Sequence, residues 1–285
     1  MLDRVDRVQV AVVDRAKAAA TFNKLLGAEI ARESNNAYLS ARRTVLAFGE
    51  SEIELCAPNG EGRVAELLRT QGEGLIGAGF ATAEPEALRR RIVKLGYEPV
   101  LEGDQFHLGP ENNFGLRFVI SQTRPRPRVG PVSALYEVTN ALRSDWRRAA
   151  AQFTALFGLD PTRFSPIHSS RFNYEGTLTL FNPPDRLDRI ELSQVTGEES
   201  AMGRWVQRHG DSQYMCYCET HDLPAVIERL NSAGARWTPR GADRAQERNG
   251  LWVHPSALHG VLLGISRTTL SWGWSGRPEL VTPAP

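Results

Sequence analysis

The sequence predicts an α+β protein built from four similar units, each a strand, a helix and three further strands (βαβββ), joined in two pairs. Three observations support this prediction. The tripeptide Ile-Glu-Leu occurs at residues 53–55 and again at residues 190–192, each time at the end of an apolar, strand-like run. Each copy is followed by a polar turn, a short amphipathic stretch and a Gly-acid pair at a nearly constant spacing. Each half of the chain also contains two successive strand-then-helix patterns, so the repeat defines the folding unit.

The first unit begins at residues 8–12, where valine alternates with polar or small residues. This period of two is typical of a strand with one buried face, and it predicts a polar opposite face. Asp14 is placed to cap a helix with apolar residues at helical spacing, and Gly27 is placed to end that helix. Short strand candidates follow, of which the first two can be parts of one irregular arm. They lie at residues 29–32, 38–40, 44–48 and 52–55.

The second unit repeats this order. Residues 74–82 form an apolar run, a Glu-Pro pair opens a helix that ends at Gly96, and three strand-like pieces follow. The next segment is rich in proline and arginine and has no periodicity, which predicts a linker. We therefore predict a first domain over residues 1–122 and a linker over residues 123–131.

The third and fourth units repeat the pattern in the second half of the chain. Residues 134–142 are strand-like, Ser144 or Asp145 caps a helix, and Gly158 ends it. The later elements are strands at residues 174–181, 189–193, 213–219, 252–254 and 261–265, and a helix that ends at Gly234. This predicts a second domain over residues 132–267, followed by a tail over residues 268–285.

The composition argues against several classes of partner. The formal net charge is +1 and 24% of the residues are charged, so a strongly charged partner such as nucleic acid is not expected. No window approaches the roughly 20 apolar residues that a membrane span needs, and the first residues lack the apolar core of a signal peptide. We expect a cytoplasmic protein with no membrane partner and with its three cysteines reduced. The expected partner is a small-molecule substrate, and a homodimer is left open.

Several short segments resemble those of a known family. Residues 6–12 read Asp-Arg-Val-Gln-Val-Ala-Val, two helices end in Leu-Gly or Phe-Gly at Gly27 and Gly158, and residues 252–255 read Trp-Val-His-Pro. Together with the four-unit layout, these segments resemble the vicinal oxygen chelate superfamily of glyoxalases, methylmalonyl-CoA epimerases, extradiol dioxygenases and bleomycin-resistance proteins. The resemblance implies two fused glyoxalase-like domains, each with its sheet curled into a cup. In the family, a cup holds a divalent metal that binds two substrate oxygens.

The resemblance also implies where a metal would bind, because the family takes a histidine from the first strand of each unit and a glutamate from the last. In the first cup, Arg7 and Gly77 stand at the histidine positions, while Glu54 stands at the glutamate position. Arginine and glycine side chains do not ligate metals, so we expect no metal in this cup. The simplest interpretation is a structural ion pair between Arg7 and Glu54. The alternative is that Arg7 binds a substrate carboxylate.

In the second cup, the resemblance puts Glu137 and Tyr214 at the histidine positions and Glu191 at the glutamate position. Strand phase directs Glu137 and Thr139 toward the cup. A carboxyl group in a partly apolar cup is harder to ionise, which moves its pKa toward the range for proton exchange. The set is therefore either an acid/base group or, through Glu137 and Glu191, an oxygen-ligand site for Mg²⁺, Mn²⁺, Zn²⁺ or Fe²⁺. The structural alternative pairs each glutamate with an arginine such as Arg189.

The leading hypothesis is an enzyme whose C-terminal cup performs proton transfer on a small oxygen-bearing organic substrate, as an epimerase, isomerase or lyase. A metal-free binding or resistance protein is the second hypothesis. An extradiol-type ring-cleaving dioxygenase is the third, because it needs two histidines and a glutamate. The candidate catalytic residues are Glu137, Glu191 and Tyr214. The candidate substrate-binding residues are Arg7, Gln9, Thr139 and His168, the last in a segment predicted to be a loop over the cup.

Overall fold

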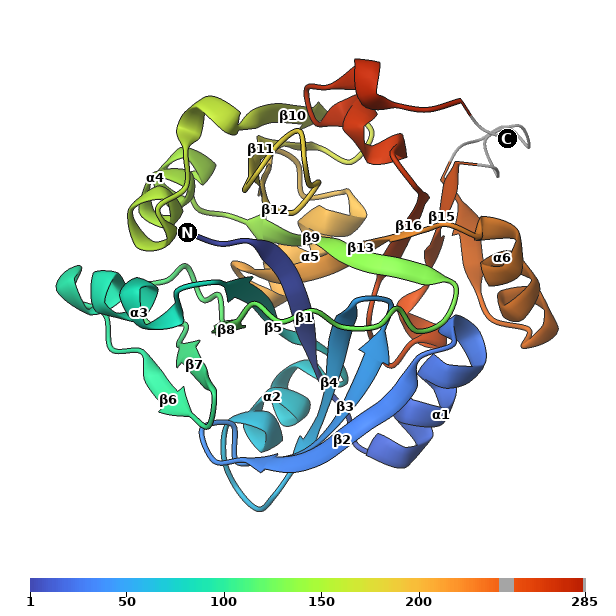
Figure 1. Cartoon of the computed structure of the whole chain (residues 1–285), viewed down its shortest axis with the longest axis horizontal. Helices are drawn as coiled ribbons and strands as arrows, with labels where there is room; N and C mark the ends of the chain where they lie inside the picture. The colour runs from blue at the N-terminus through green and yellow to red at the C-terminus, as the bar shows by residue number, and fades with distance from the viewer. Residues whose placement is uncertain (241–248, 284–285) are drawn as a thin grey trace.

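The strands form two eight-stranded sheets, one from each half of the chain (Figure 1). The computed structural model describes residues 1–240 and 249–283. The strands of the first sheet are β1 (Arg4–Ala11), β2 (Glu29–Asn36), β3 (Ala41–Phe48), β4 (Ser51–Pro58), β5 (Gly74–Thr82), β6 (Val100–Glu102), β7 (Gln105–Leu108) and β8 (Phe118–Gln122). Their order in space is β2-β3-β4-β1-β5-β8-β7-β6.

The second sheet repeats the topology of the first. Its strands are β9 (Val132–Leu142), β10 (Ser165–Ser169), β11 (Tyr174–Leu180), β12 (Arg189–Val195), β13 (Ser212–Thr220), β14 (Trp237–Pro239), β15 (Gly250–Val253) and β16 (Leu263–Arg267). Their order is β10-β11-β12-β9-β13-β16-β15-β14. In each sheet two units meet along their first strands, which pair antiparallel, while each first strand pairs parallel with the last strand of its own unit. The predicted α+β fold of four βαβββ units is confirmed.

Helices complete the units. They are α1 (Arg15–Leu26), α2 (Arg63–Gln71), α3 (Pro85–Lys94), α4 (Trp146–Phe157), α5 (Ala201–His209) and α6 (Leu223–Ser232). Asp14 caps α1 by accepting a hydrogen bond from the Lys17 backbone N–H at 3.0 Å, and Asp145 caps α4 in the same way. None of the described helices combines the length and the apolar character that a membrane crossing requires.

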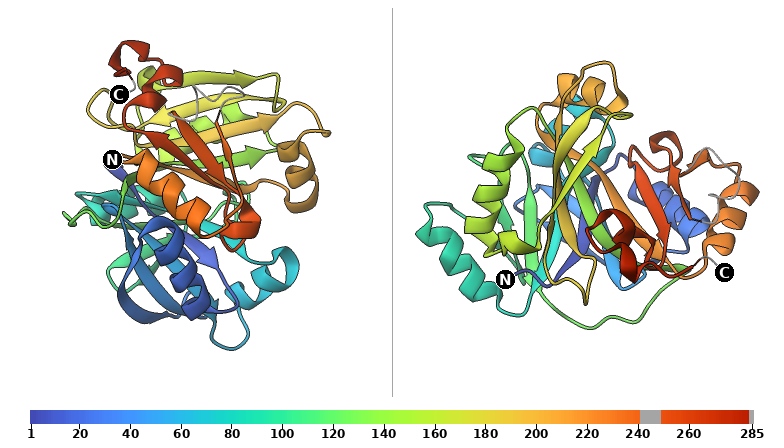
Figure 2. Two further views of the ribbon diagram at one scale, coloured as in Figure 1. Left: turned by 90° about the vertical axis from the view of Figure 1, so that its right-hand side faces the viewer. Right: turned by 90° about the horizontal axis from the view of Figure 1, so that it is seen from above.

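The concave faces of the two sheets are called the first cup and the second cup below. Helices α1, α3, α4 and α6 pack on the convex faces, where one hydrophobic core joins both halves of the chain. Helix α1 of the first half lies beside α6 of the second, as Figure 2 shows, and Arg229 donates a hydrogen bond to the Asn23 carbonyl at 3.0 Å. Helices α2 and α5 pack instead on the cup faces.

The two cups are also joined by buried polar contacts. The Val5 backbone N–H donates to Asp188 Oδ1 at 2.6 Å, and the Leu135 N–H donates to Ser51 Oγ at 3.0 Å. The predicted linker runs between β8 and β9, and its Val129 forms an isolated bridge with Gly49. The two halves therefore pack as one body.

Two local predictions are wrong. Residues 38–40, predicted as a strand, form the turn between β2 and β3, where Ser40 adopts a φ of 50°. Residues 165–170, predicted as a loop over the cup, are mostly the edge strand β10, which pairs with β11 along its length. At residues 165–170 the pairing with β11 overrides the local pattern, because main-chain hydrogen bonds to a neighbouring strand decide the conformation. Residues 38–40 lie outside the β2–β3 pairing, which ends at Asn36 and Ala41.

The predicted tail, which has no counterpart in the repeat, packs on the second cup. It forms the short 3-10 helices η4 (Leu270–Trp274) and η5 (Pro278–Leu280). Trp272 is 6% exposed and joins a cluster with Tyr136, Leu178 and Leu180 of the second sheet. One end of the second cup is thus covered by the tail.

Candidate functional site

Strand register gives each residue of one cup an equivalent in the other. In the first cup, Arg7 of β1 lies opposite Glu52 of β4. In the second cup, Glu137 of β9 lies opposite Arg189 of β12. Both pairs form ion pairs, with 2.9 Å between Arg7 Nη1 and Glu52 Oε2 and 2.6 Å between Arg189 Nε and Glu137 Oε2. The same two positions therefore hold an ion pair of opposite polarity in the two cups.

A β-bulge follows the same symmetry. Asp6 is the extra residue where β1 pairs with β5, and Tyr136 is the extra residue where β9 pairs with β13. A bulge interrupts the strict alternation of side chains and changes the direction of the side chain beside it. Consecutive residues can then face the same side, and Asp6 and Arg7 contact each other in the first cup. The equivalent serines contact the bulged residues in both cups, because Ser121 Oγ lies 3.2 Å from Asp6 Oδ2 and Ser266 Oγ lies 3.1 Å from the Tyr136 hydroxyl.

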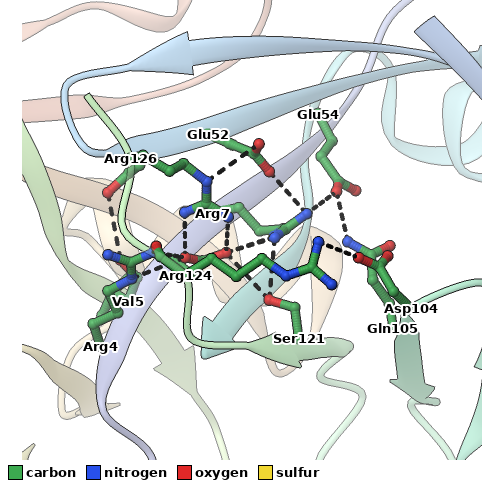
Figure 3. Close-up of polar contacts among 12 residues, drawn as sticks. Arg4, Val5, Arg7, Glu52, Glu54, Asp104, Gln105, Ser121, Arg124 and Arg126 are labelled. Atoms are coloured by element: carbon green, nitrogen blue, oxygen red, sulfur yellow. Dashed lines mark hydrogen bonds and ion pairs between the residues drawn. The ribbon is translucent and has the colours of Figure 1, made fainter. Parts of the chain in front are cut away.

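Glu54 of β4 is fully buried, and Figure 3 shows its carboxylate in contact with Arg7 and Gln105. Its carboxylate accepts hydrogen bonds from Arg7 at 2.7 Å, Gln9 at 2.8 Å, and Arg43 and Gln105 at 3.1 Å. Burial acts to raise the pKa of Glu54, but the charges of Arg7 and Arg43 outweigh it and lower the pKa to about 2. The predicted ion pair between Arg7 and Glu54 is present.

A second buried carboxylate, Asp6, extends this network. It contacts Arg4 at 2.9 Å, Arg7 at 2.6 Å and Arg126 at 2.5 Å. Although burial opposes ionisation, the hydrogen bond from Arg126 and the neighbouring positive charges hold the pKa of Asp6 well below its usual range. Figure 3 shows Arg126, which comes from the predicted linker, reaching this network together with Glu52.

The first cup is therefore filled by its own side chains. Arg7 and Gln9, the two residues predicted there to bind substrate, are each 2% exposed and both contact Glu54. Arg43 and Gln105 contact each other at 2.8 Å and close the space above Glu54. The structure thus gives Arg7 and Gln9 buried partners within the first cup.

The second cup brings together Glu137, Thr139 and Glu191, three of the predicted site residues. Thr139 Oγ1 lies 3.2 Å from Glu137 Oε1 and 3.2 Å from Glu191 Oε2, so this hydroxyl bridges the two carboxyl groups. Ser193 donates to Glu191 Oε1 at 2.5 Å. Thr139 is 1% exposed, so its hydroxyl contacts the two carboxyl groups and is shielded from solvent.

The two carboxyl groups share one buried counter-ion. Arg189 contacts Glu137, whereas the hydrogen-bond partners of Glu191 among the described side chains are hydroxyl groups. Burial raises the pKa of Glu191 well above its usual range, and the nearby charge of Glu137 raises it further. The pKa of Glu191 thus shifts in the opposite direction from that of its equivalent, Glu54. The exposed fraction of Glu191, 7%, is larger than the 1% of Glu137.

Arg189 is held by more than its carboxylate partner. Its guanidinium lies 4.8 Å from the centre of the Tyr136 ring, and its Nη1 contacts the Leu187 carbonyl at 3.4 Å. Within the described chain its Nη2 has no hydrogen-bond acceptor. The face of the Tyr136 ring accounts for this, because a guanidinium is attracted to the negative face of an aromatic ring. Arg189 thus fixes Glu137 in one position.

Tyr217 lies opposite Glu137, in the place that the sequence pattern gave to Tyr214. A register shift between Gln213 and Met215 makes Tyr214 an extra residue, so the alternation downstream of it is reversed. Tyr214 packs against Trp205 of α5, with 5.5 Å between ring centres. The described contacts include no hydrogen bond between Tyr214 and either glutamate. The sequence carries no signal for such a bulge.

The second cup is lined by aromatic side chains where the first is filled. Gly176 and Gly250 occupy the register positions that Arg43 and Gln105 occupy in the first cup. The aromatic residues of this lining are intermediate in exposure, not buried: Tyr174, Tyr214, Tyr217, Trp252 and Trp274. Trp252 donates a hydrogen bond to the Tyr217 hydroxyl at 3.1 Å. Solvent therefore reaches the side chains of this cup.

His168 does not reach this lining. It is exposed on the edge strand β10, where it pairs in register with Glu175. Its neighbour Ile167 packs toward the cup with Tyr136 and Trp272, so strand alternation directs His168 to the opposite face. The predicted role of His168 in substrate binding rested on a loop that is a strand in the structure.

The donor set of the second cup does not fit the metal that the resemblance implies. Glu137 already forms an ion pair with Arg189. The residues in register with Glu137 on the next two strands are Tyr217 and Gly264, which stand where further ligands would be needed. Among the described residues, no group of three or more histidine, cysteine, aspartate or glutamate side chains could hold a metal ion. A guanidinium in contact with a ligand carboxylate would repel a dication. The side chains of the second cup therefore do not fit a metal centre.

Comparisons with known proteins identify the fold. No family model matches the sequence, and no curated protein matches it. A mutant of 4-hydroxymandelate synthase from Streptomyces coelicolor superposes with a TM-score of 0.73, at 14% identity, over 94% of this chain and 93% of its own. A fusion of a xylose isomerase-like TIM barrel with 4-hydroxyphenylpyruvate dioxygenase gives a TM-score of 0.66, at 12% identity, over 94% of this chain and 49% of its own. The predicted resemblance is confirmed at the level of the fold: the chain has the tandem vicinal oxygen chelate fold.

Proposed function

We propose that this protein is an enzyme that transfers protons to and from a small oxygen-bearing organic substrate in the second cup. The observation that carries the proposal is the bridged pair of carboxyl groups, Glu137 and Glu191, which shares a single buried arginine. Carboxyl groups whose ionisation is perturbed by burial and by each other are frequent at catalytic sites. The equivalent carboxylate in the first cup is neutralised by two arginines, so the fold does not require an unneutralised glutamate at this position.

The geometry supports a specific path for the proton. Glu191 in its ionised form takes a proton from an acidic C–H group of the substrate, and the Thr139 hydroxyl, which contacts both carboxyl groups, relays a proton to Glu137. The number of protons on the three groups and the substrate is unchanged in this exchange. Arg189 keeps Glu137 in place during the transfer. We assign to the Tyr217 hydroxyl, which accepts a hydrogen bond from Trp252, a hydrogen bond to the oxyanion that develops on the substrate, with its proton kept on the tyrosine.

The proposal is tested by exchange of substrate protons with solvent. Small carbonyl acids are incubated with the protein in D₂O, and loss of their C–H signals is followed by NMR. The wild type is expected to accelerate the exchange for the compounds it accepts, and Glu191→Gln is expected to lose roughly 10² to 10⁴-fold of that rate, because it cannot accept a proton. Glu191→Gln retaining the full rate would contradict the proposal.

Glu54→Gln is the matched control, since it makes the same change at the equivalent position of the first cup. It is expected to keep the exchange rate at temperatures at which it remains folded. The assay is repeated with EDTA and with added Mg²⁺, Mn²⁺, Zn²⁺ or Fe²⁺. Loss of exchange with EDTA and its recovery with one of these ions would contradict the metal-free path and would favour a metal enzyme.

The second candidate function is that of a metal-free binding or resistance protein. The half-exposed aromatic lining of the second cup favours it, because aromatic side chains line many small-molecule sites. Such a protein would bind compounds without exchanging their protons, and Glu191→Gln would bind them as tightly as the wild type does. The dioxygenase hypothesis has less support. A dioxygenase of this family needs two histidines and a glutamate, and the strand positions in register with Glu137 do not carry them.

A further inference from the structure

The rim of the second cup carries a cation held among aromatic rings. Arg240 directly follows β14, and its guanidinium carbon lies 3.8 Å from the centre of the Trp274 ring. The same carbon lies 5.4 Å from the centre of the Tyr217 ring and 5.7 Å from that of Trp252. Ser266 Oγ accepts a hydrogen bond from Arg240 Nη1 at 3.0 Å. These contacts place one positive charge at the border of the aromatic lining.

The aromatic contacts orient the guanidinium, and among the described residues no carboxylate forms an ion pair with it. A ring face attracts a cation weakly, whereas a carboxylate binds a guanidinium through two parallel charge-assisted hydrogen bonds. Arginine has five N–H donors in a planar fork, and the hydrogen bond to Ser266 uses one of them. Because the side chain of Arg240 is already fixed by Trp274, binding an anion costs it little conformational entropy.

Arg240 faces the same space as the carboxyl pair. Burial raises the pKa values of Tyr174 and Tyr217, and the charges of Glu191 and Glu137 raise them further, while the charge of Arg240 acts in the opposite direction on both. Tyr217 lies opposite Glu137 at one end and under Arg240 at the other. Tyr217 therefore links the carboxyl pair to the cation at the rim.

The equivalent region of the first cup is built differently. There, β6 ends at Glu102, whose carboxylate accepts a hydrogen bond from the Ala37 backbone N–H at 2.9 Å. This contact ties the turn after β2 to β6. In the second cup, the turn before β11 instead meets β15 through a contact between the Phe172 and Trp252 rings, with 6.4 Å between their centres. The first rim is closed by an acidic side chain, and the second presents a basic one.

We propose that Arg240 binds a carboxylate group of the substrate, so that the second cup takes small organic acids and holds their reactive carbon toward Glu191. The inference rests on the proposed function, since it names the substrate class of that site. It assigns a positioning role in binding to a residue that the sequence pattern did not mark. The proton transfer itself remains with the carboxyl pair.

The test is a binding experiment that needs no turnover. Acetate, malonate and benzoate are titrated into the protein, with benzamide as the uncharged counterpart of benzoate, and binding is followed by calorimetry and by the fluorescence of the tryptophans that flank Arg240. Arg240→Met, which keeps much of the apolar stem, is expected to weaken carboxylate binding by roughly 10- to 100-fold. Arg240→Lys keeps the positive charge but loses the paired N–H donors of the guanidinium, so an intermediate affinity is expected.

Arg236→Met is the matched control, because Arg236 is exposed, directly precedes β14 as Arg240 directly follows it, and has the same charge. It is expected to bind every probe as the wild type does, and benzamide affinity is expected to be the same in all variants. Equal carboxylate affinity in wild type and Arg240→Met would overturn the inference, as would failure of every carboxylate to bind the wild type at tens of millimolar. Circular dichroism of each variant separates a binding defect from misfolding.

The same titration in Glu191→Gln distinguishes the two proposals. If the carboxylates bind Glu191→Gln and require Arg240, but the wild type exchanges no substrate proton, then the anion site is supported and the proposed enzyme activity is not. If exchange requires Glu191 but carboxylates bind independently of Arg240, then the activity is supported and the substrate class is wrong.

Discussion

At the scale of single residues, Glu54 and Glu191 show how neighbours decide the state of one side chain. Both are the central residue of an Ile-Glu-Leu segment, and both occupy the same place in their sheet. Glu54 has Arg7 and Arg43 within 3.1 Å, so its pKa falls to about 2. Glu191 has another carboxyl group beside it, and its pKa rises. The same residue type is the ionised partner of two arginines in one cup and a carboxyl group with a raised pKa in the other.

The ionisation of Glu54 should contribute measurably to stability. Its pKa falls from 4.5 to about 2 on folding, which corresponds to about 3 kcal/mol of unfolding free energy at neutral pH. Since the folded pKa is the lower one, this contribution is present above pH 4.5 and is lost as the pH falls toward 2. Glu54→Gln is therefore expected to be less stable than the wild type by about 3 kcal/mol at pH 7.

Urea denaturation followed by circular dichroism at a series of pH values measures this effect. The difference between Glu54→Gln and the wild type should shrink as the pH is lowered below 4.5. A difference that stays constant over the acid range would show that lost packing, and not lost charge, causes the destabilisation. An exposed substitution of the same kind, Glu86→Gln on α3, is the control and is expected to have little effect.

At the scale of secondary-structure elements, bulges and glycines decide what fills each cup. The bulges at Asp6 and Tyr136 re-aim the residues next to them, and the bulge at Tyr214 puts Tyr217 opposite Glu137. Gly79 lies opposite Arg7, and a Cβ atom added there would overlap the stem of Arg7. Each cup therefore keeps a glycine where a large side chain crosses a neighbouring strand.

A matched pair of glycine substitutions tests this arrangement. An added Cβ at Gly264 would overlap the Tyr217 ring, just as one at Gly79 would overlap Arg7. Both Gly79→Ala and Gly264→Ala are expected to destabilise the protein by about 1 to 3 kcal/mol, because the crowded side chain must move. Only Gly264→Ala is expected to slow the proton exchange as well. Equal exchange rates in the two variants would argue against the proposed role of Tyr217.

At the scale of the whole molecule, the two halves share one core and are expected to unfold together. Phe118 of the first half lies 5.3 Å from Phe153 of the second, and Phe80 lies 5.8 Å from Phe181, measured between ring centres. Asp188 accepts the buried hydrogen bond from Val5 across the same boundary. Neither half can lose its structure without exposing apolar surface of the other.

The distribution of tryptophan makes this testable without a label. All 6 tryptophans lie in the second half of the chain, beginning with Trp146. If unfolding is a single transition, Glu54→Gln in the first cup will lower the urea midpoint of tryptophan fluorescence as much as that of circular dichroism. A fluorescence midpoint that stays at the wild-type value, with an earlier transition in circular dichroism, would mean that the halves unfold separately.

The sequence by itself determined the architecture. Period-two runs, Asp14 as a cap, the glycines that end helices and the repeated Ile-Glu-Leu are local signals, and they predicted the four units and the fold class. They also predicted that Glu137 and Thr139 share a face, because side chains alternate along a strand. These properties depend on residues close together in the chain, so the sequence contains them.

Only the tertiary structure decided which cup is filled and which residues meet. Tyr217 replaces Tyr214 because a bulge shifts the register, and His168 turns outward because its segment pairs as an edge strand. Arg126 and Arg240 reach their cups from segments whose local sequence gives no sign of it. Contacts between distant strands set these outcomes, since pairing and burial act on the folded chain and leave no pattern within a single segment.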